Sequence, residues 1–278
     1  MKVFVVDVAK CNGCYNCQIA CKDEHVGNDW APYAKPQPDT GQFWLKVHEK
    51  VHGSVPKVKM SYTSIMCMHC ENAPCMQSCQ ENAIYRRDDG LVLIDTEKCS
   101  GCMNCVDDCP YGVIYYNEDL KLAQKCTGCA HLLDQGWEVP RCVDACATDA
   151  LQFGDEEDFK ELIAKADVLH DEYGTSPRVY YMNLPKKFIA GTIYDPEIDE
   201  VLIGAVITLQ NEDTEEVLKV ETDSFGDFWF KNLETGTYSL WIEKDGYLTQ
   251  TMQHISTEED VNVGDIALYK EAVQALAN

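Results

Sequence analysis

The sequence predicts an α+β protein made of two domains of different kinds, and three observations lead to this expectation. All sixteen cysteines lie between Cys11 and Cys146, and the residues after Cys146 include none. About seven short alternating apolar runs follow residue 188, which is the pattern of β-strands. One amphipathic helical pattern lies between the two regions. We therefore expect a cysteine-rich domain over residues 1–153, a docking helix with a linker over 154–187, and an all-β sandwich over 188–278.

Four cysteine motifs make up the first domain. The first and third share one spacing, with three cysteines at x2 intervals and a fourth after x3: Cys11, Cys14, Cys17 and Cys21, and Cys99, Cys102, Cys105 and Cys109, the last followed by Pro110. The second and fourth keep the final x3 spacing but have a longer loop before the third cysteine: Cys67, Cys70, Cys75 and Cys79, and Cys126, Cys129, Cys142 and Cys146. The first spacing is that of bacterial ferredoxins, in which three cysteines bind one [4Fe-4S] cluster and the fourth binds another. The motifs therefore predict four clusters bound by paired motifs, and spacing alone leaves the pairing open.

Zinc is the alternative metal, because CxxC pairs also build four-thiolate zinc sites that only stabilise a fold. A zinc ribbon needs two CxxC pairs for each ion. Two motifs here instead have three cysteines at strict x2 intervals and a fourth after x3, and this regularity favours iron–sulfur clusters.

Short β-rich segments separate the motifs. Ile84 to Ile94 contains two apolar runs around Asp88-Asp89-Gly90, which predicts a hairpin. Phe4–Val8 and Gly112–Tyr116 are also strand-like, and Asp95 is a candidate turn residue before the third motif. We expect the helices of this domain to be brief.

Six polar residues lie near the cysteines and raise the question of further ligands: His25, His69, His131, Lys22, Lys125 and Arg141. Because sixteen cysteines suffice for four clusters, we expect the histidines to be hydrogen-bond donors or surface contacts rather than ligands. We expect the three cations to be solvated, with an influence on cluster potentials as the alternative. The sequence has no phosphate-binding loop, nucleophile elbow or HExxH motif, so we expect a non-catalytic electron-transfer protein.

The cysteine pattern over residues 1–153 resembles the four-cluster iron–sulfur subunits of the dimethyl-sulfoxide-reductase superfamily of molybdenum and tungsten oxidoreductases. The resemblance implies two pseudo-symmetric ferredoxin-like modules, with the first motif paired with the fourth and the second with the third. It also implies a heterodimer whose large partner alone carries the molybdenum or tungsten pterin cofactor, and it leaves room for a further redox partner. The implied ligand sets are Cys11, Cys14, Cys17 and Cys146 (cluster 1); Cys21, Cys126, Cys129 and Cys142 (cluster 2); Cys67, Cys70, Cys75 and Cys109 (cluster 3); and Cys79, Cys99, Cys102 and Cys105 (cluster 4).

The second half begins with a helical pattern over Asp155–Gly174, which places five apolar residues on one face: Phe159, Leu162, Ile163, Ala166 and Leu169. A linker over 175–185 leads to seven runs near Phe188, Val206, Leu218, Trp229, Leu240, Thr251 and Ile266. This region, over residues 188–269, resembles the prealbumin-like repeat of carboxypeptidase regulatory modules, a fold similar to the immunoglobulin sandwich. Gly226 is expected in a hairpin turn, and Phe228, Phe230, Tyr238, Leu240 and Ile242 in the core. We expect a structural or partner-binding role for it.

The fusion of this β-module to the cluster domain, together with the strings Asp23-Glu24-His25 and Pro177–Tyr181, resembles the small subunits of pyrogallol–phloroglucinol transhydroxylase and related anaerobic phenol-modifying enzymes. The resemblance implies a partner with two pyranopterin guanine dinucleotides that transhydroxylates or dehydroxylates a polyphenol. The complete cysteine set tilts this towards a relative that exchanges electrons, such as a catechol dehydroxylase. The alternatives are a free polyferredoxin, a zinc-stabilised adhesion protein, and a subunit of a superfamily member with a non-phenolic substrate.

Charge and hydropathy limit the other partners. Residues 1–150 carry 20 acidic and 14 basic residues, whereas residues 151–278 carry 27 and 9. This acidity disfavours nucleic acid or an anionic membrane surface as a partner. The longest apolar run, Val201–Gln210, is well short of the ~20 residues of a membrane helix, and no secretory signal opens the sequence. We expect a cytoplasmic protein without direct membrane insertion, with export on a signal-bearing partner as the alternative.

Overall fold

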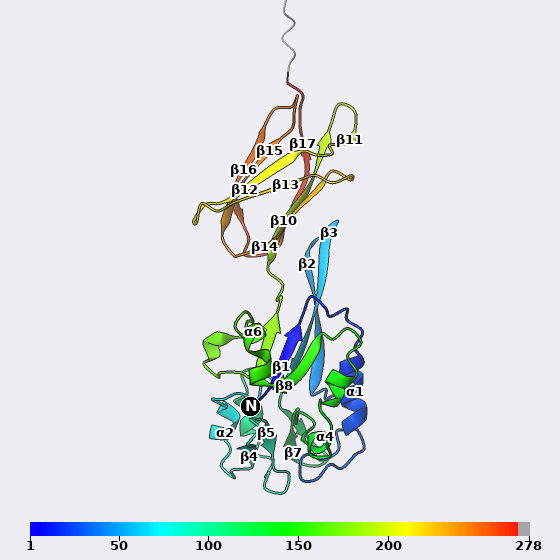
Figure 1. Cartoon of the computed structure of the whole chain (residues 1–278), viewed down its shortest axis with the longest axis vertical. Helices are drawn as coiled ribbons and strands as arrows, with labels where there is room; N and C mark the ends of the chain where they lie inside the picture. The colour runs from blue at the N-terminus through cyan, green and yellow to red at the C-terminus, as the bar shows by residue number, and fades with distance from the viewer. Residues whose placement is uncertain (272–278) are drawn as a thin grey trace, which may run out of the picture. The chain divides into compact units, whose positions relative to one another are not determined.

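The computed structural model describes residues 1–271, and the chain divides into two compact units (Figure 1). Unit 1 comprises residues 1–50 and 61–184, and unit 2 comprises Val51–Met60 and the chain from Pro185 onward. The two units have separate hydrophobic cores. No helix within residues 1–271 is long and apolar enough to cross a membrane.

The sheet of unit 1 has three strands in the order β8-β1-β9. The central strand β1 (Lys2–Asp7) is antiparallel to β8 (Leu151–Asp155) and parallel to β9 (Val179–Met182). Its inner residues are all buried, because a central strand with both faces covered must be apolar throughout. The prediction of a strand over Phe4–Val8 is therefore confirmed.

Two small hairpins and five short helices complete the part of unit 1 that carries cysteines. The hairpins are β4 (Ile84–Arg86) with β5 (Val92–Ile94), and β6 (Tyr115–Asn117) with β7 (Leu122–Gln124). The helices are α1 (Asn16–His25), α2 (Pro74–Gln77), α3 (Asn104–Asp107), α4 (Ala130–Asp134) and α5 (Arg141–Asp144). The expected hairpin, the brief helices and the turn at Asp95, whose Oδ1 accepts from the Glu97 and Lys98 amides, are all confirmed. The strand expected over Gly112–Tyr116 starts only at Tyr115.

A long hairpin formed by β2 (Leu45–Ser54) and β3 (Lys57–Met66) was not expected from the sequence. Its base belongs to unit 1, whereas its tip, Val51–Met60, belongs to unit 2. In unit 2 the tip residue Lys57 forms a buried ion pair with Asp227, and His52 Nδ1 lies 3.0 Å from Asp260 Oδ2. Single polar residues of this kind carry no periodic signal, so strand patterns alone do not reveal such contacts.

The single helix expected over Asp155–Gly174 is wrong. The segment forms 3₁₀ turns at Glu156–Phe159 and Asp171–Tyr173 and a one-turn helix, α6 (Lys160–Ile163). The helix ends there because the chain pairs with β9 instead: Asp167 and Tyr181 exchange two backbone hydrogen bonds of 2.8 Å. The expected linker likewise contains strand β9. Tertiary pairing thus overrides the helical pattern.

Unit 2 is a sandwich of two four-stranded sheets (Figure 1). One contains β10 (Lys187–Asp195), β11 (Glu200–Val201), β14 (Asp227–Leu233) and β17 (Val261–Ala267); the other has the order β13 (Val217–Glu221), β12 (Val206–Asn211), β15 (Thr237–Glu243), β16 (Gln250–Ser256). All seven expected runs are strands, and the five expected core residues are buried. Gly226 has a φ of 72° in the turn before β14, as predicted.

Candidate metal centres

The loops of the four motifs bend in the same way, because each has a residue with positive φ directly before its second cysteine: Gly13, His69, Gly101 and Gly128. At Gly101 the requirement is steric as well, since a Cβ there would overlap the carbonyl oxygen of Lys121. His69 adopts φ 44°, which is uncommon for a residue other than glycine and shows that tertiary contacts hold this loop. These bends turn backbone amides towards sulfur, with Gly128 N 3.4 Å from Cys126 Sγ and His69 N 3.5 Å from Cys67 Sγ.

A short helix carries the third cysteine of each motif, and the fourth cysteine lies on the same helix in the first motif and two residues after the helix in the other three. Cys17 and Cys21 lie on α1, which packs against α5, the helix that carries Cys142 and leads to Cys146. In the same way α2 packs against α3. The folding of unit 1 thus brings the first motif next to the fourth and the second next to the third.

Two cavities of unit 1 are each lined by four cysteines that come from two different motifs. The larger cavity is lined by Cys67, Cys70, Cys75 and Cys109. The smaller is lined by Cys79, Cys99, Cys102 and Cys105. The remaining lining residues are almost all apolar. Four sulfur donors around an apolar hollow fit an iron–sulfur cluster in donor type, and among residues 1–271 no three His, Cys, Asp or Glu side chains crowd together as a single-ion site does.

The ligand sets implied by the resemblance divide the other eight cysteines into two further groups, and the electrostatics show that these cysteines of the first and fourth motifs lie close to one another. Burial raises the pKa of Cys21 and Cys142 well above the usual value, and the neighbouring Cys126 and Cys129 raise it further. Burial also raises the pKa of Cys17 to about 11, with a contribution from Cys146. Burial disfavours the charged thiolate, and a thiol must lose its proton to bind a metal, so metal binding at these groups would release protons.

The four groups differ in exposure. Cys14 and Cys102, one in each of the first and third motifs, are exposed. By contrast, the group of Cys21, Cys126, Cys129 and Cys142 is entirely buried, and in the group that lines the larger cavity only Cys109 is partly exposed. Two of the groups are therefore shielded from water, and two approach the surface.

The three histidines are buried, at 1 to 2% exposure, so the expectation of surface contacts is wrong. His25 Nε2 lies 3.9 Å from Cys129 Sγ, and His131 Nε2 lies 3.0 Å from Glu24 Oε1. His69 Nδ1 accepts the amide hydrogen of Val92, so Nε2 carries the ring proton. The expected role of hydrogen-bond donor is wrong for His69 Nδ1, which accepts, and for His25 and His131 it stays a prediction.

Two of the three cations also depart from the expected solvated state. Lys125 is 2% exposed, and its Nζ donates to the carbonyl oxygens of Val92 and Cys126. Lys22 is half-buried and donates to the carbonyls of Pro38 and Gln42. Arg141, with a side chain 34% exposed, pairs with Asp144. Only the arginine resembles an ordinary surface charge.

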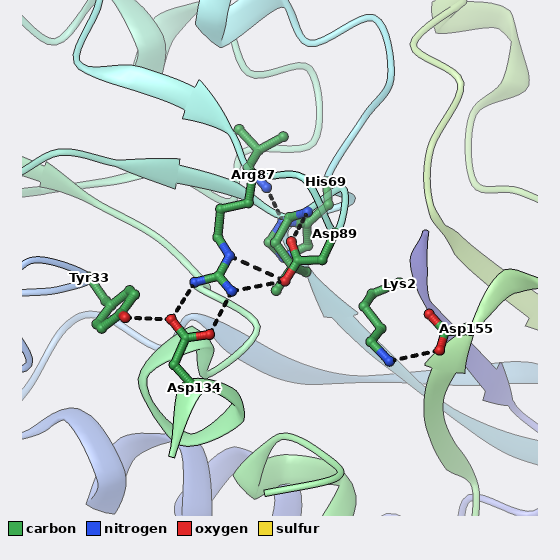
Figure 2. Close-up of polar contacts among 9 residues, drawn as sticks. Lys2, Tyr33, His69, Arg87, Asp89, Asp134 and Asp155 are labelled. Atoms are coloured by element: carbon green, nitrogen blue, oxygen red, sulfur yellow. Dashed lines mark hydrogen bonds and ion pairs between the residues drawn. The ribbon is translucent and has the colours of Figure 1, made fainter. Parts of the chain in front are cut away.

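An ion pair that the sequence does not reveal joins the β4–β5 hairpin to α4 (Figure 2). Arg87 donates to both carboxylate oxygens of Asp134, at 2.8 and 2.9 Å, and also contacts Asp89. Tyr33 donates to the same carboxylate. Hydrogen bonds from Arg87 and Tyr33 lower the pKa of Asp134 to about 2. The pair therefore stays charged at physiological pH and holds α4, which lies within the fourth motif, against the β4–β5 hairpin.

The sequence matches two known domain families. Residues 58–156 match the 4Fe-4S dicluster domain, and residues 189–269 match the carboxypeptidase regulatory-like domain. Among solved structures, the streptococcal ancillary pilin matches 34% of this chain and 32% of its own, with 22% identity and a TM-score of 0.27.

Curated relatives extend the match along the chain. The pyrogallol hydroxytransferase small subunit of Pelobacter acidigallici is 40% identical over 255 residues, which cover 87% of this chain and 90% of the relative. A tetrathionate reductase subunit of Salmonella typhimurium is 33% identical over 66% of this chain and 73% of its own length. A component of the anaerobic dimethyl sulfoxide reductase of Escherichia coli is 34% identical over 57% of this chain and 75% of its own length.

The folding of unit 1 and the dicluster match define an iron–sulfur electron-transfer protein. This protein belongs to the family of iron–sulfur small subunits of dimethyl-sulfoxide-reductase-type oxidoreductases, and within it is similar to the pyrogallol hydroxytransferase small subunit over most of its length. The family and fold class predicted from the cysteine spacing and strand pattern are confirmed.

Proposed function

We propose that the protein binds four [4Fe-4S] clusters through its sixteen cysteines and conducts electrons to or from a large subunit that holds a molybdenum or tungsten pterin cofactor. The observation that carries the proposal is that each of two cavities is lined by four cysteines drawn from two different motifs. Each bound cluster supplies one-electron chemistry. The chain itself supplies thiolates, burial and hydrogen bonds to sulfur.

The proposed ligand sets combine the first motif with the fourth and the second with the third. Clusters 3 and 4 are assigned to the two cysteine-lined cavities. Clusters 1 and 2 are assigned to the two remaining groups, which the packing of α1 on α5 supports.

The four sites follow one another in the order 1, 2, 3, 4. Cys17 of site 1 is close enough to Cys142 of site 2 to raise the pKa of its thiol, and Cys67 of site 3 raises the pKa of Cys126 of site 2 in the same way. Helix α2 joins sites 3 and 4, because it carries Cys75 of site 3 and ends two residues before Cys79 of site 4. The two buried sites are then in the middle of the row and the two with exposed cysteines are at its ends. Such an order suits a conductor that exchanges electrons with partners at both ends.

We propose a polyphenol as the substrate of the complex, and its transhydroxylation or dehydroxylation would take place on the large subunit. Support comes from the 40% identity to the pyrogallol hydroxytransferase small subunit, which covers 87% of this chain, whereas the two reductase relatives cover 66% and 57%. The second candidate is a complex with a non-phenolic substrate, favoured by the 33% identity to the tetrathionate reductase subunit. A free polyferredoxin is the third.

Anaerobic purification of the native protein tests the proposal. We expect a brown protein with about sixteen iron atoms per chain and a large subunit that contains molybdenum or tungsten. A colourless protein that contains only zinc would contradict the cluster assignment, and purification without a large subunit would favour the free polyferredoxin. Turnover of pyrogallol or catechol, compared with tetrathionate, then distinguishes the substrates. Fractionation of native cells tests the expected cytoplasmic location against export with a signal-bearing partner.

A further inference from the structure

Lys125 is a buried cation at a central position among the cysteine groups of unit 1. Its side chain is 2% exposed, and the two groups that accept its hydrogen bonds are both next to proposed cluster sites. One acceptor is the carbonyl of Cys126, a proposed ligand of cluster 2. The other is the carbonyl of Val92, a residue that lines the cavity of cluster 3.

Charge compensation distinguishes this lysine from the surface cations. Within residues 1–271, no carboxylate oxygen lies within the 4.0 Å of an ion pair from Lys125 Nζ. A buried charge is normally paired, because transfer of an ion out of water is costly. The closest anionic groups that the fold can supply are the thiolates of clusters 2 and 3, since a cubane bound by four thiolates carries a net negative charge.

We propose that the ammonium of Lys125 raises the reduction potentials of the two central clusters, 2 and 3, and leaves those of the terminal clusters, 1 and 4, almost unchanged. Reduction adds one electron to a cluster that is already negative, and a nearby buried cation stabilises that added charge. The effect is strong here because the site is shielded from water and from salt. This inference rests on the proposed function, which places clusters at these cysteines.

The physical consequence is that the two central clusters accept electrons more readily than their burial alone allows. The central sites are buried, whereas the terminal sites each include an exposed cysteine, Cys14 or Cys102. Burial opposes the addition of negative charge to a cluster, and the buried ammonium offsets this effect where it is largest.

Lys22 provides a matched control within the same unit. It also follows the pattern of a lysine beside a ligand, Cys21, and its Nζ also donates to two backbone carbonyls. It differs in being half-buried, and neither of its acceptors, Pro38 and Gln42, lines either of the two cysteine-lined cavities. Its removal should therefore affect cluster potentials much less.

The test is a redox titration of the native complex, followed by electron paramagnetic resonance, for the unmodified protein and four variants. Lys125→Met removes the charge and the donor, Lys125→Gln removes the charge alone, Lys125→Arg keeps both, and Lys22→Met is the control. We expect the Met and Gln variants at 125 to lower two of the four midpoint potentials, with at least a tenfold fall in the equilibrium constant for one-electron reduction, or about 59 mV. In Lys125→Arg and in the control Lys22→Met, this equilibrium constant should change by less than about threefold.

Three results would overturn the inference. One is a change of less than about threefold in the equilibrium constant for one-electron reduction in a Lys125→Gln protein that retains all its iron. Another is an equal shift of all four potentials. The third is a fall of tenfold or more in the equilibrium constant for one-electron reduction in the Lys22→Met control. Absence of clusters from the unmodified protein would instead refute the proposed function.

Discussion

The pairing of motifs can be tested by removing cysteines in twos. Cys75 and Cys109 belong to different motifs but line the same cavity, whereas Cys105 and Cys109 belong to one motif and line different cavities. We therefore compare the double variant Cys75→Ala/Cys109→Ala with Cys105→Ala/Cys109→Ala. Both remove two thiols, so the variants differ only in whether the thiols belong to one cluster or two.

The magnitudes follow from four iron atoms per cavity. Loss of two ligands from one cluster should abolish that cluster and leave the other three intact, so the first variant should keep about twelve of about sixteen iron atoms. Loss of one ligand from each of two clusters should either abolish both, leaving about eight iron atoms, or leave two three-iron clusters and about fourteen iron atoms. The two classes of variant do not overlap in iron content.

The assay combines total iron and acid-labile sulfide with the electron paramagnetic resonance spectrum of the oxidised protein, in which three-iron clusters have a characteristic signal. The first variant should lack this signal, and the second should show it or lose twice as much iron. If the two results are interchanged, each motif binds its own cluster, and the crossed ligand sets proposed for the two cavities are wrong.

Three further predictions concern residues other than the cysteines. Leu240→Ala removes a fully buried side chain from the sandwich core and should lower the free energy of unfolding by about 3 kcal/mol and the calorimetric transition temperature of unit 2 by about 10 °C or more. The control Leu218→Ala, at a residue 36% exposed, should lower the free energy of unfolding by less than about 1 kcal/mol. Equal shifts would contradict the assigned core. Burial raises the pKa of Asp195, but hydrogen bonds from Lys270 and Tyr247 outweigh it, so the pKa lies below its usual value. The carboxylate therefore stabilises the fold at pH values above the ordinary pKa of about 3.9 and loses this effect as the pH falls through the lower pKa of the folded state. Below about pH 4 the transition temperature of unit 2 should fall more steeply in the unmodified protein than in Asp195→Asn. Parallel dependence of the two transition temperatures on pH would refute this. Arg87 and Asp134, whose side chains are 20% and 41% exposed, should have a coupling energy of about 1 kcal/mol in a double-mutant cycle. The stability of each variant is measured from the loss of visible absorbance as denaturant is added. Additive effects of the two substitutions would show that solvent screens the pair completely.

Several features could be predicted from the sequence because they are local. The spacing of the cysteines reflects the size of the loop that surrounds one cluster. The alternation of Phe228 and Phe230 reflects the two-residue period of a strand with one buried face, and the structure confirms that both are buried. The hairpin around Gly90 follows from turn residues between two apolar runs.

Other features were missed or predicted wrongly because they depend on residues far apart in the sequence. The helix expected over Asp155–Gly174 is cut short by pairing between Asp167 and Tyr181. The long hairpin that turns just before Lys57 has a mixed apolar and polar pattern. Which of its residues are buried depends partly on contacts such as the ion pair between Lys57 and Asp227. Nothing in the identity of Lys125 distinguishes it from a surface lysine until the fold covers it.

The sequence by itself therefore determined the kind of chemistry and the two kinds of domain, since ligand type, ligand spacing and strand period are properties of short segments. Only the tertiary structure decided which cysteines of different motifs share a cavity, which of the four groups are shielded from water, and where a charge is buried. These properties arise when helices such as α1 and α5, more than one hundred residues apart, pack together. Burial and long-range contact are consequences of the whole fold and leave no mark on the segments that they bring together.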